Sequence, residues 1–352
     1  MKRKTGDRMT LRFATIFKSH FWDSDVAERF ERLKNLGIPE DTWLVFDETH
    51  GPAPGTGDLN QAFATSERQL AEIGLHVYPA GLANWYNNDY QAVAFWEKIG
   101  SGRYDYLVVA EHDVVVQTPL PPLVQWCFDN QVDLLAAPVR QPMATWSWRH
   151  TCDHLWPMES LQAFLLCFSV FSARALQRIG EVRRVHRDRL VRGELKSWPF
   201  CEGFVPMVLR DAGLRIASLD ALGDMSAYDW WPPIHSSEVP RFAKRLVLHP
   251  VLSGRRYVQS TLRYWDAVDW FDSDSLLRSR LSLEPPDIVL SELFASLEKA
   301  GRVDGLIELL NLCRSEGNDD LRLRVEAALK QRSVGSPLDL ASSQSAHQSS
   351  NL

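Results

Sequence analysis

The segment from Tyr104 to Val116, YDYLVVAEHDVVV, most constrains the fold, because it is a nearly continuous apolar run that presents two carboxylates. A short run of this kind without polar alternation is typical of a strand buried on both faces of a sheet. Glu111 and Asp113 flank His112 within it. Acidic side chains beside an apolar strand are costly unless a cation compensates them, so the pattern indicates a divalent metal site.

The first half of the chain alternates strand-like and helix-like segments, which is typical of βαβ units on a mostly parallel sheet. We therefore expect a doubly wound, Rossmann-like α/β fold, in which ligands bind at the carboxyl ends of the strands. The expected strands are residues 11–19, 41–49, 75–81, 104–116 and 132–139. A first helix is expected to begin after a cap at Asp23 or Ser24 and to end at Gly37. Further helices are expected at 60–73, 89–100 and 119–127.

The second half contains fewer periodic segments. Residues 141–156 are rich in Trp, His and Pro, so we expect an active-site loop there. Residues 163–176 predict a strand followed by a helix, and Glu202 begins a short helix that closes at Gly213. A last short strand is expected at 245–251 and carries His249.

Composition changes suggest four parts. We expect a flexible N-terminus at residues 1–10 and one large domain at 11–284. Residues 285–332 are rich in Leu, Glu and Arg at helical spacing, which predicts a helical appendage able to bind a protein partner. The Ser- and Gln-rich residues 333–352 have too few apolar side chains to fold, so we expect a disordered tail.

The overall composition limits the possible partners and compartment. With a net charge of −6 across 352 residues, the chain is not expected to bind nucleic acid generally. The basic cluster 183–192 is expected to be a solvated helix face, with contact to an anion as the alternative. There is no apolar stretch near the roughly 20 residues of a membrane helix and no signal peptide, so we expect a cytoplasmic protein. Five cysteines without a CxxC pair predict reduced, packed thiols.

Taken in order, several motifs resemble those of the GT-A class of nucleotide-sugar glycosyltransferases. EHD stands where that class has its DxD motif, which implies Asp113 as a metal ligand and Glu111 in contact with the metal, its water or the ribose. VFDETHG implies that Asp47 faces the nucleotide base. WYNNDYQAV implies that Asn87 and Asn88 approach the ribose and diphosphate.

The same resemblance extends to the later motifs. CEGFVPMVLRDAGLRI implies that Glu202 is the catalytic base of an inverting enzyme, and the HP pair implies that His249 also reaches the metal. The first acid of DxD is Glu here, and Gly203 replaces the second acid that usually follows the base. The resemblance implies a Mn²⁺ or Mg²⁺ cofactor, a nucleotide-diphosphate sugar donor and a carbohydrate or glycolipid acceptor.

Tryptophans in the non-periodic regions are candidates for acceptor binding, because the apolar faces of sugar rings pack on indoles. They are Trp146, Trp148, Trp198, Trp230 and Trp231. Two other functions remain open. A sugar-nucleotide pyrophosphorylase would need a Gly-rich loop after the first strand, and FKSHFWDSD has no Gly. A non-catalytic carbohydrate-binding or scaffold protein could keep the same fold without turnover.

Overall fold

The computed structural model describes residues 11–52 and 61–334. The chain divides into two compact units: residues 1–231 with 242–250, and residues 232–241 with 251–352. The expected flexible N-terminus and nearly all of the expected tail lie outside the described residues. Ser333 and Val334, the first two residues of that expected tail, end the last helix.

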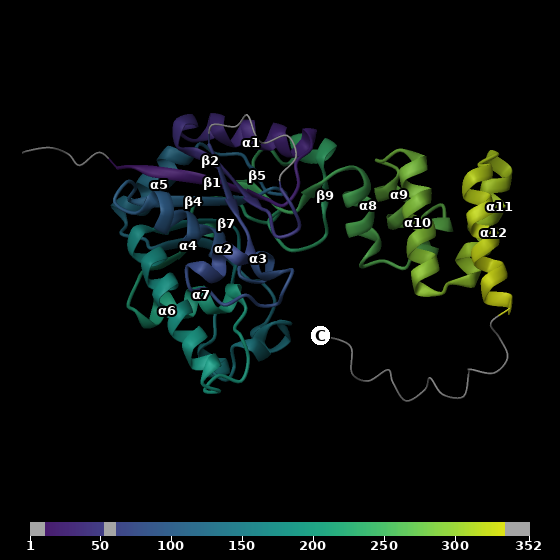
Figure 1. The fold of residues 1–352 in the computed structure, drawn as a ribbon. Helices are drawn as coiled ribbons and strands as arrows, with labels where there is room; N and C mark the ends of the chain where they lie inside the picture. Colours follow the sequence, from purple (N-terminus) through teal and green to yellow (C-terminus); the bar gives the residue numbers. More distant parts are fainter. Residues whose placement is uncertain (1–10, 53–60, 335–352) are drawn as a thin grey trace, which may run out of the picture. The chain divides into compact units, whose positions relative to one another are not determined.

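A seven-stranded sheet forms the centre of the first unit, in the order β3-β2-β1-β4-β7-β6-β8 (Figure 1). All neighbouring strands are parallel except those beside β7, which runs antiparallel to β4 and β6. The predicted mostly parallel α/β fold is thus confirmed. The strands are β1 Phe13–Ser19, β2 Thr42–Asp47, β3 Ala62–Thr65, β4 Tyr106–Glu111, β6 Leu134–Pro138, β7 Phe164–Ser172 and β8 Ile216–Ser218.

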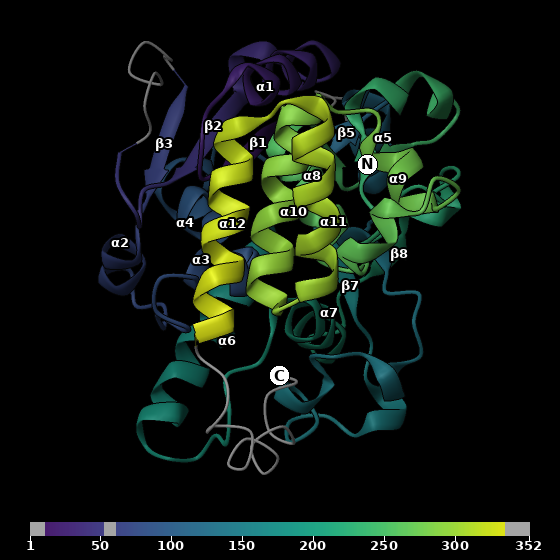
Figure 2. The same ribbon diagram turned by 90° about the vertical axis from the view of Figure 1, so that its right-hand side faces the viewer.

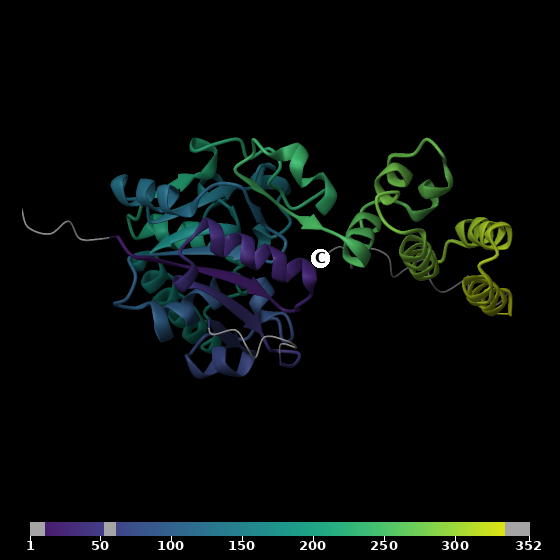
Figure 3. The ribbon, with the colours of Figure 1, turned by 90° about the horizontal axis from the view of Figure 1, so that it is seen from above.

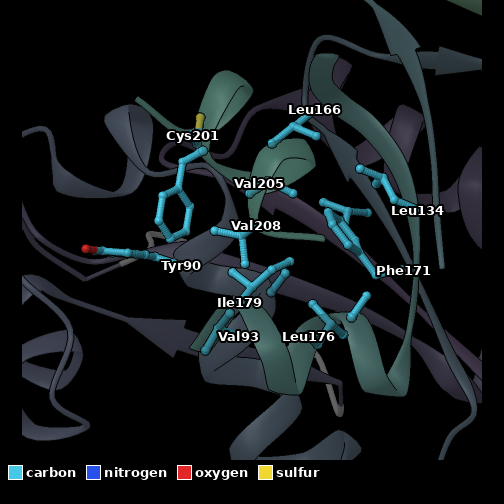
Figure 4. Close-up of a cluster of buried hydrophobic side chains, with 14 of the residues drawn as sticks. Tyr90, Val93, Leu134, Leu166, Phe171, Leu176, Ile179, Cys201, Val205 and Val208 are labelled. Carbon is cyan, nitrogen blue, oxygen red and sulfur yellow. The ribbon is translucent and has the colours of Figure 1, made fainter. Parts of the chain in front are cut away.

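Helices cover both faces of this sheet because its strands are apolar on both sides. In β1, Phe17 faces a cluster with α1 (Ser24–Leu36) and α5 (Leu120–Asp129), and Figure 3 shows α1 lying over the strands. Ile16, one residue earlier, faces the opposite cluster, because successive side chains of a strand alternate. Figure 4 shows part of that cluster, which packs the sheet against α4 (Asp89–Phe95), α6 (Ala173–Val191) and α7 (Cys201–Asp211).

The prediction for residues 60–81 was wrong. The expected helix at 60–73 is instead the edge strand β3 followed by the short helix α2 (Glu67–Glu72), whose N-cap is Ser66. The expected strand at 75–81 is a loop. Pro79 lies in that run and has no backbone donor for a strand ladder, whereas AFAT is too short to show a clear period.

Two short strands that are far apart in the sequence pair with each other just after the end of β4. β5 (Val115–Val116) pairs antiparallel with β10 (Val247–Leu248), and Leu248 lies opposite Val115. This pairing brings His249, the next residue, beside the EHD segment. The expected strand at 245–251 is therefore split into β10 and β11 (Val251–Leu252), and β11 belongs to the second unit.

The second unit is mainly helical around its own apolar core, and Figure 2 shows its last three helices side by side. It also has a parallel pair of β9 (Ile234–His235) and β11. This core includes Tyr257 and Leu277, so the unit starts before the expected boundary at 285, where only the composition changes. Its helices are α8 Gly254–Leu262, α9 Leu276–Leu281, α10 Pro286–Ala300, α11 Val303–Glu316 and α12 Asp319–Val334.

Shorter helices complete the architecture. The loop expected at 141–156 contains 3-10 turns at Met143–Thr145 and Arg149–Thr151, and α3 (Ala83–Tyr86) precedes α4. A π-helical turn at Trp96–Gly100 continues α4. In the part of the chain that the structure describes, no helix has the length and apolar character needed to cross a bilayer.

Candidate metal and donor site at the edge of the sheet

The candidate site lies where β1 and β4 end. The strand order runs from β1 outward to β2 and β3 and then resumes on the other side of β1 with β4, so the topology switches between these two strands. Open α/β sheets bind ligands in the crevice at such a switch point. Lys18 of β1 lies in register with Glu111 of β4.

The Glu111 carboxylate is held by two neighbours. The Lys18 ammonium lies 3.5 Å from Glu111 Oε1, and the Asn88 side-chain amide donates to the same oxygen. Lys18 also donates to Asn88 Oδ1 at 2.7 Å and to the Asn88 carbonyl at 2.9 Å. Lys18 is not among the site residues expected from the sequence, although a single cation near the end of an apolar strand is a signal for one. These contacts fix Glu111 in one orientation.

Asp113 and His249 meet across the β5–β10 pair. His249 Nε2 lies 3.5 Å from Asp113 Oδ2, while His249 Nδ1 lies 2.6 Å from the Asp229 carbonyl. Burial alone lowers the pKa of His249, but the charges of Asp113 and Glu111 raise it to about 9. Burial raises the pKa of Asp113, but His249 and His112 together hold it well below its ordinary value.

Cys167 adds a donor that sequence analysis did not connect with the site. β7 runs antiparallel to β4 with Ala110 opposite Phe168, so the pairing of the two strands ends beside Glu111 and Cys167. Donor atoms of Glu111, Cys167 and His249 all lie within 4.8 Å of one another. Burial, with added contributions from nearby carboxylates such as Glu111, raises the pKa of the Cys167 thiol well above its ordinary value.

These side chains fit a divalent cation. Asp113 Oδ1 is buried and has no hydrogen-bond partner among the described residues, so it is an unused anionic ligand atom. The Nδ1 of His249 faces a carbonyl, which favours the tautomer whose Nε2 lone pair is free for a metal. Oxygen and imidazole donors suit divalent cations such as Mn²⁺.

Glu202 lies in the first turn of α7, as expected. Burial, with a smaller contribution from the Glu111 charge, raises its pKa to about 8, while His249 and a hydrogen bond from Trp146 act in the opposite direction. Gly203 explains the departure from the GT-A pattern: a Cβ there would come within 2.9 Å of the Trp146 ring. Gly203 therefore allows Trp146 to reach Glu202.

The other donor-side residues have different surroundings. Asp47 ends β2 at the same edge of the sheet, and its carboxylate accepts from the Thr49 amide at 3.0 Å. Asn87 is fully buried: it donates to the carbonyls of Tyr78 and Ala83 and accepts from Trp198 Nε1 at 2.8 Å. The Asn87 amide therefore makes hydrogen bonds only within the protein, including one to the loop at 75–81. Asn88 is the residue of this pair that reaches Glu111.

The five tryptophans expected at an acceptor site separate into two groups. Trp146 and Trp198 are only 3% and 2% exposed, so the structure does not offer their rings to an acceptor. Trp148 is partly exposed and stacks on Phe200, with ring centroids 4.5 Å apart. Trp230 and Trp231 lie beside each other and Trp230 is exposed.

Trp85 is a further aromatic residue of this region that was not expected from the sequence. This ring is 58% exposed and lies 5.9 Å from the Trp148 ring and 6.0 Å from that of Phe200. Phe200 is the N-cap residue of α7 and precedes Glu202 by two positions. An exposed aromatic surface of Trp85 and Trp148 therefore lies near the helix turn that carries Glu202.

No protein-family model matches the sequence, and no curated protein matches it. Solved structures with a similar arrangement include mouse xyloside xylosyltransferase 1, at 11% identity and a TM-score of 0.38 over 67% of this chain and 97% of that one. Galactosyltransferase LgtC, in complex with donor and acceptor sugar analogues, has 11% identity and a TM-score of 0.39 over 67% of this chain and 86% of that one.

Core-mannan synthase A from Aspergillus fumigatus, in an Mn/GDP form, has 10% identity and a TM-score of 0.37 over 61% of this chain and 74% of that one. The structural neighbours are thus GT-A glycosyltransferases at low identity.

Proposed function

We propose that this chain is a metal-dependent glycosyltransferase that moves a sugar from a nucleotide-diphosphate donor to a hydroxyl group of a carbohydrate or glycolipid. The observation that carries the proposal is the convergence of Glu111, Asp113 and His249 at the switch point of the sheet, near the partly buried Glu202 side chain. Perturbed acids gathered with metal-type donors at such an edge are typical of an active site.

Asp113 and His249 would hold the cation, with Glu111 as a ligand or as a contact to its water. A bound Mn²⁺ or Mg²⁺ would stabilise the negative charge that grows on the departing nucleotide diphosphate. Lys18 and Asn88 keep Glu111 in place. Asp47, at the same edge of the sheet, is the proposed partner of the nucleotide base.

Glu202 is the proposed general base. A hydroxyl group is a poor nucleophile at neutral pH, and a nearby carboxylate can take its proton during attack. A pKa of about 8 lies close to neutral pH, where a base has both a useful ionised fraction and a strong affinity for the proton. Direct attack on the face opposite the leaving group would invert the anomeric carbon.

Trp148 and Trp85 form the proposed acceptor surface, because their partly exposed rings lie near the first turn of α7. Indole faces suit the apolar faces of sugar rings. Trp230 and Trp231 remain candidates for a second part of this surface. Trp146 and Trp198 support the site from the core instead.

Calorimetric titration with UDP and GDP, with and without Mn²⁺, tests the proposal. We expect one nucleotide to bind only with the metal, and we expect Asp113→Ala to abolish that binding. Asp153→Ala, which removes an exposed carboxylate from the Trp-rich loop, is the control and should bind normally. If no nucleoside diphosphate binds with any divalent metal, the non-catalytic scaffold function becomes the better explanation.

A further inference from the structure

Cys167 differs from the other cysteines in its surroundings. Cys127, Cys152, Cys201 and Cys313 are buried members of the hydrophobic clusters. Cys167 is partly exposed and packs only at the margin of one cluster, and the charges of Glu111, Asp113 and Glu202 add to burial in raising the pKa of its thiol. Three carboxylates do not stabilise a neighbouring thiol unless a cation binds between them.

We propose that Cys167 is a ligand of the bound cation, so that the centre combines a sulfur donor with oxygen and imidazole donors. This inference rests on the proposed function and specifies its metal centre. The supporting geometry is that the donor atoms of Glu111, Cys167 and His249 all lie within 4.8 Å of one another. Three donors from β4, β7 and the end of β10 thus converge, with the unused Asp113 Oδ1 as a fourth candidate.

The sheet explains why the thiol faces this centre. Cys167 precedes Phe168, which lies opposite Ala110 in the antiparallel pairing of β7 with β4. The thiol therefore lies at the end of this ladder, where Glu111 follows Ala110. Its sulfur lies within 4.8 Å of donor atoms of Glu111 and His249, and Cys167 also packs at the margin of the cluster with α1 and α5.

A sulfur ligand changes which cations bind best. Thiolates prefer softer ions such as Zn²⁺, Co²⁺ and Cd²⁺, whereas Mg²⁺ prefers oxygen donors. Binding would release the thiol proton to solvent, because the thiolate is the form that coordinates a metal. We therefore expect the wild-type chain to favour Co²⁺ over Mg²⁺ by a larger factor than a variant that lacks the thiol.

Titration of the metal-free full chain with Co²⁺ tests this inference, because a cobalt–thiolate bond gives charge-transfer absorption in the near ultraviolet. We expect this absorption in the wild type and in the control Cys127→Ala, and its loss in Cys167→Ala. Calorimetry should show that Cys167→Ala binds Co²⁺ at least about 10- to 100-fold more weakly, the range seen when even an outer-shell partner of a metal is removed. Its affinity for Mg²⁺ should change much less.

Two results would overturn the inference. If Co²⁺ binds to the wild type with visible absorption but without the near-ultraviolet band, Cys167 is not a ligand, and Mn²⁺-dependent nucleotide binding would show that the proposed function still holds. If neither Co²⁺ nor Mn²⁺ binds and no nucleotide binds, the proposed metal site fails together with the inference. Circular dichroism of each variant excludes loss of folding as the cause.

Discussion

Arg183 and Asp89 form a doubly hydrogen-bonded ion pair, with 2.7 Å between Nη2 and Oδ1 and 2.9 Å between Nε and Oδ2. Both side chains are fully buried, so the prediction that the basic cluster 183–192 is a solvated face is wrong for Arg183. The guanidinium also donates to the Pro199 carbonyl at 3.1 Å and packs over the Phe204 ring. It thereby ties α6 to the start of α4, next to Asn88.

Replacing Arg183 with Met should destabilise the first unit strongly. The substitution leaves the Asp89 carboxylate buried without its partner, and losses of this kind typically cost about 3–5 kcal/mol. Urea unfolding measures the change. Arg178→Met on the same helix is the control, because its contact with Glu181 is exposed and such pairs contribute about 0–1 kcal/mol. Equal effects of the two substitutions would contradict a structural role for the buried pair.

Glu202→Gln should lower the rate of sugar transfer by about 100- to 10,000-fold, the usual contribution of a general base. The amide keeps the size of the side chain but cannot accept the proton of the attacking hydroxyl. Binding of the nucleotide and metal, measured by calorimetry, should stay within a few-fold of the wild type. Glu159→Gln, at an exposed position, is the control. Unchanged turnover in Glu202→Gln would assign the base elsewhere.

Ionisation of Glu202 should lower the stability of the metal-free protein as the pH rises from about 4.5 to 8. Folding raises the pKa of Glu202 from its ordinary 4.5 to about 8, so within this window the native state keeps a proton that the unfolded state releases. The unfolded state then binds fewer protons, and the free energy of unfolding falls with pH.

For Glu202 this loss should be on the order of 2–4 kcal/mol across the window. Urea unfolding in the presence of a chelator, at pH 5, 6.5 and 8, should show a smaller fall in Glu202→Gln. The pKa of His249 is also raised, so the free energy of unfolding should fall further between about pH 6.5 and 9, equally in the wild type and in Glu202→Gln. Identical pH profiles would mean that Glu202 ionises normally in the folded chain.

Trp85→Ala should raise the acceptor KM by about 2- to 10-fold and leave the donor KM unchanged. The indole is 58% exposed, so its removal should not disturb the core, while an aromatic face worth about 0.5–1.5 kcal/mol in packing would be lost to the sugar. Phe128→Ala removes an exposed ring from α5 on the other face of the sheet and is the control. A change in donor KM would argue for a different position of the acceptor.

Much of the fold could be predicted, because strands such as β4 and β7 are apolar runs with clear ends. The edge of the sheet that carries Glu111 followed from the rule for parallel strands. Cys167 could not be found in this way, because its position depends on β7 pairing antiparallel with β4, a register that no local pattern shows. β3 was missed because an edge strand of four residues has no period.

The side-chain environments were harder to predict than the elements. Lys18 was read only as part of a strand, and its contact with Glu111 depends on the pairing of β1 with β4. The rings of Trp146 and Trp198 were placed at the acceptor because they lie in non-periodic segments. Irregular backbone can still be covered by other segments, and both rings are buried.

The path of the chain around His249 sets the order in which the centre can form. Residues 232–241 belong to the second unit, and the chain returns to the first only for 242–250, where β10 pairs with β5. During synthesis the sheet can therefore assemble, with Glu111, Asp113 and Cys167 in place, before the histidine has been made. Metal affinity then reports whether the chain has been completed through residue 250, so a product cut short after Trp231 would keep the acids but lack the imidazole.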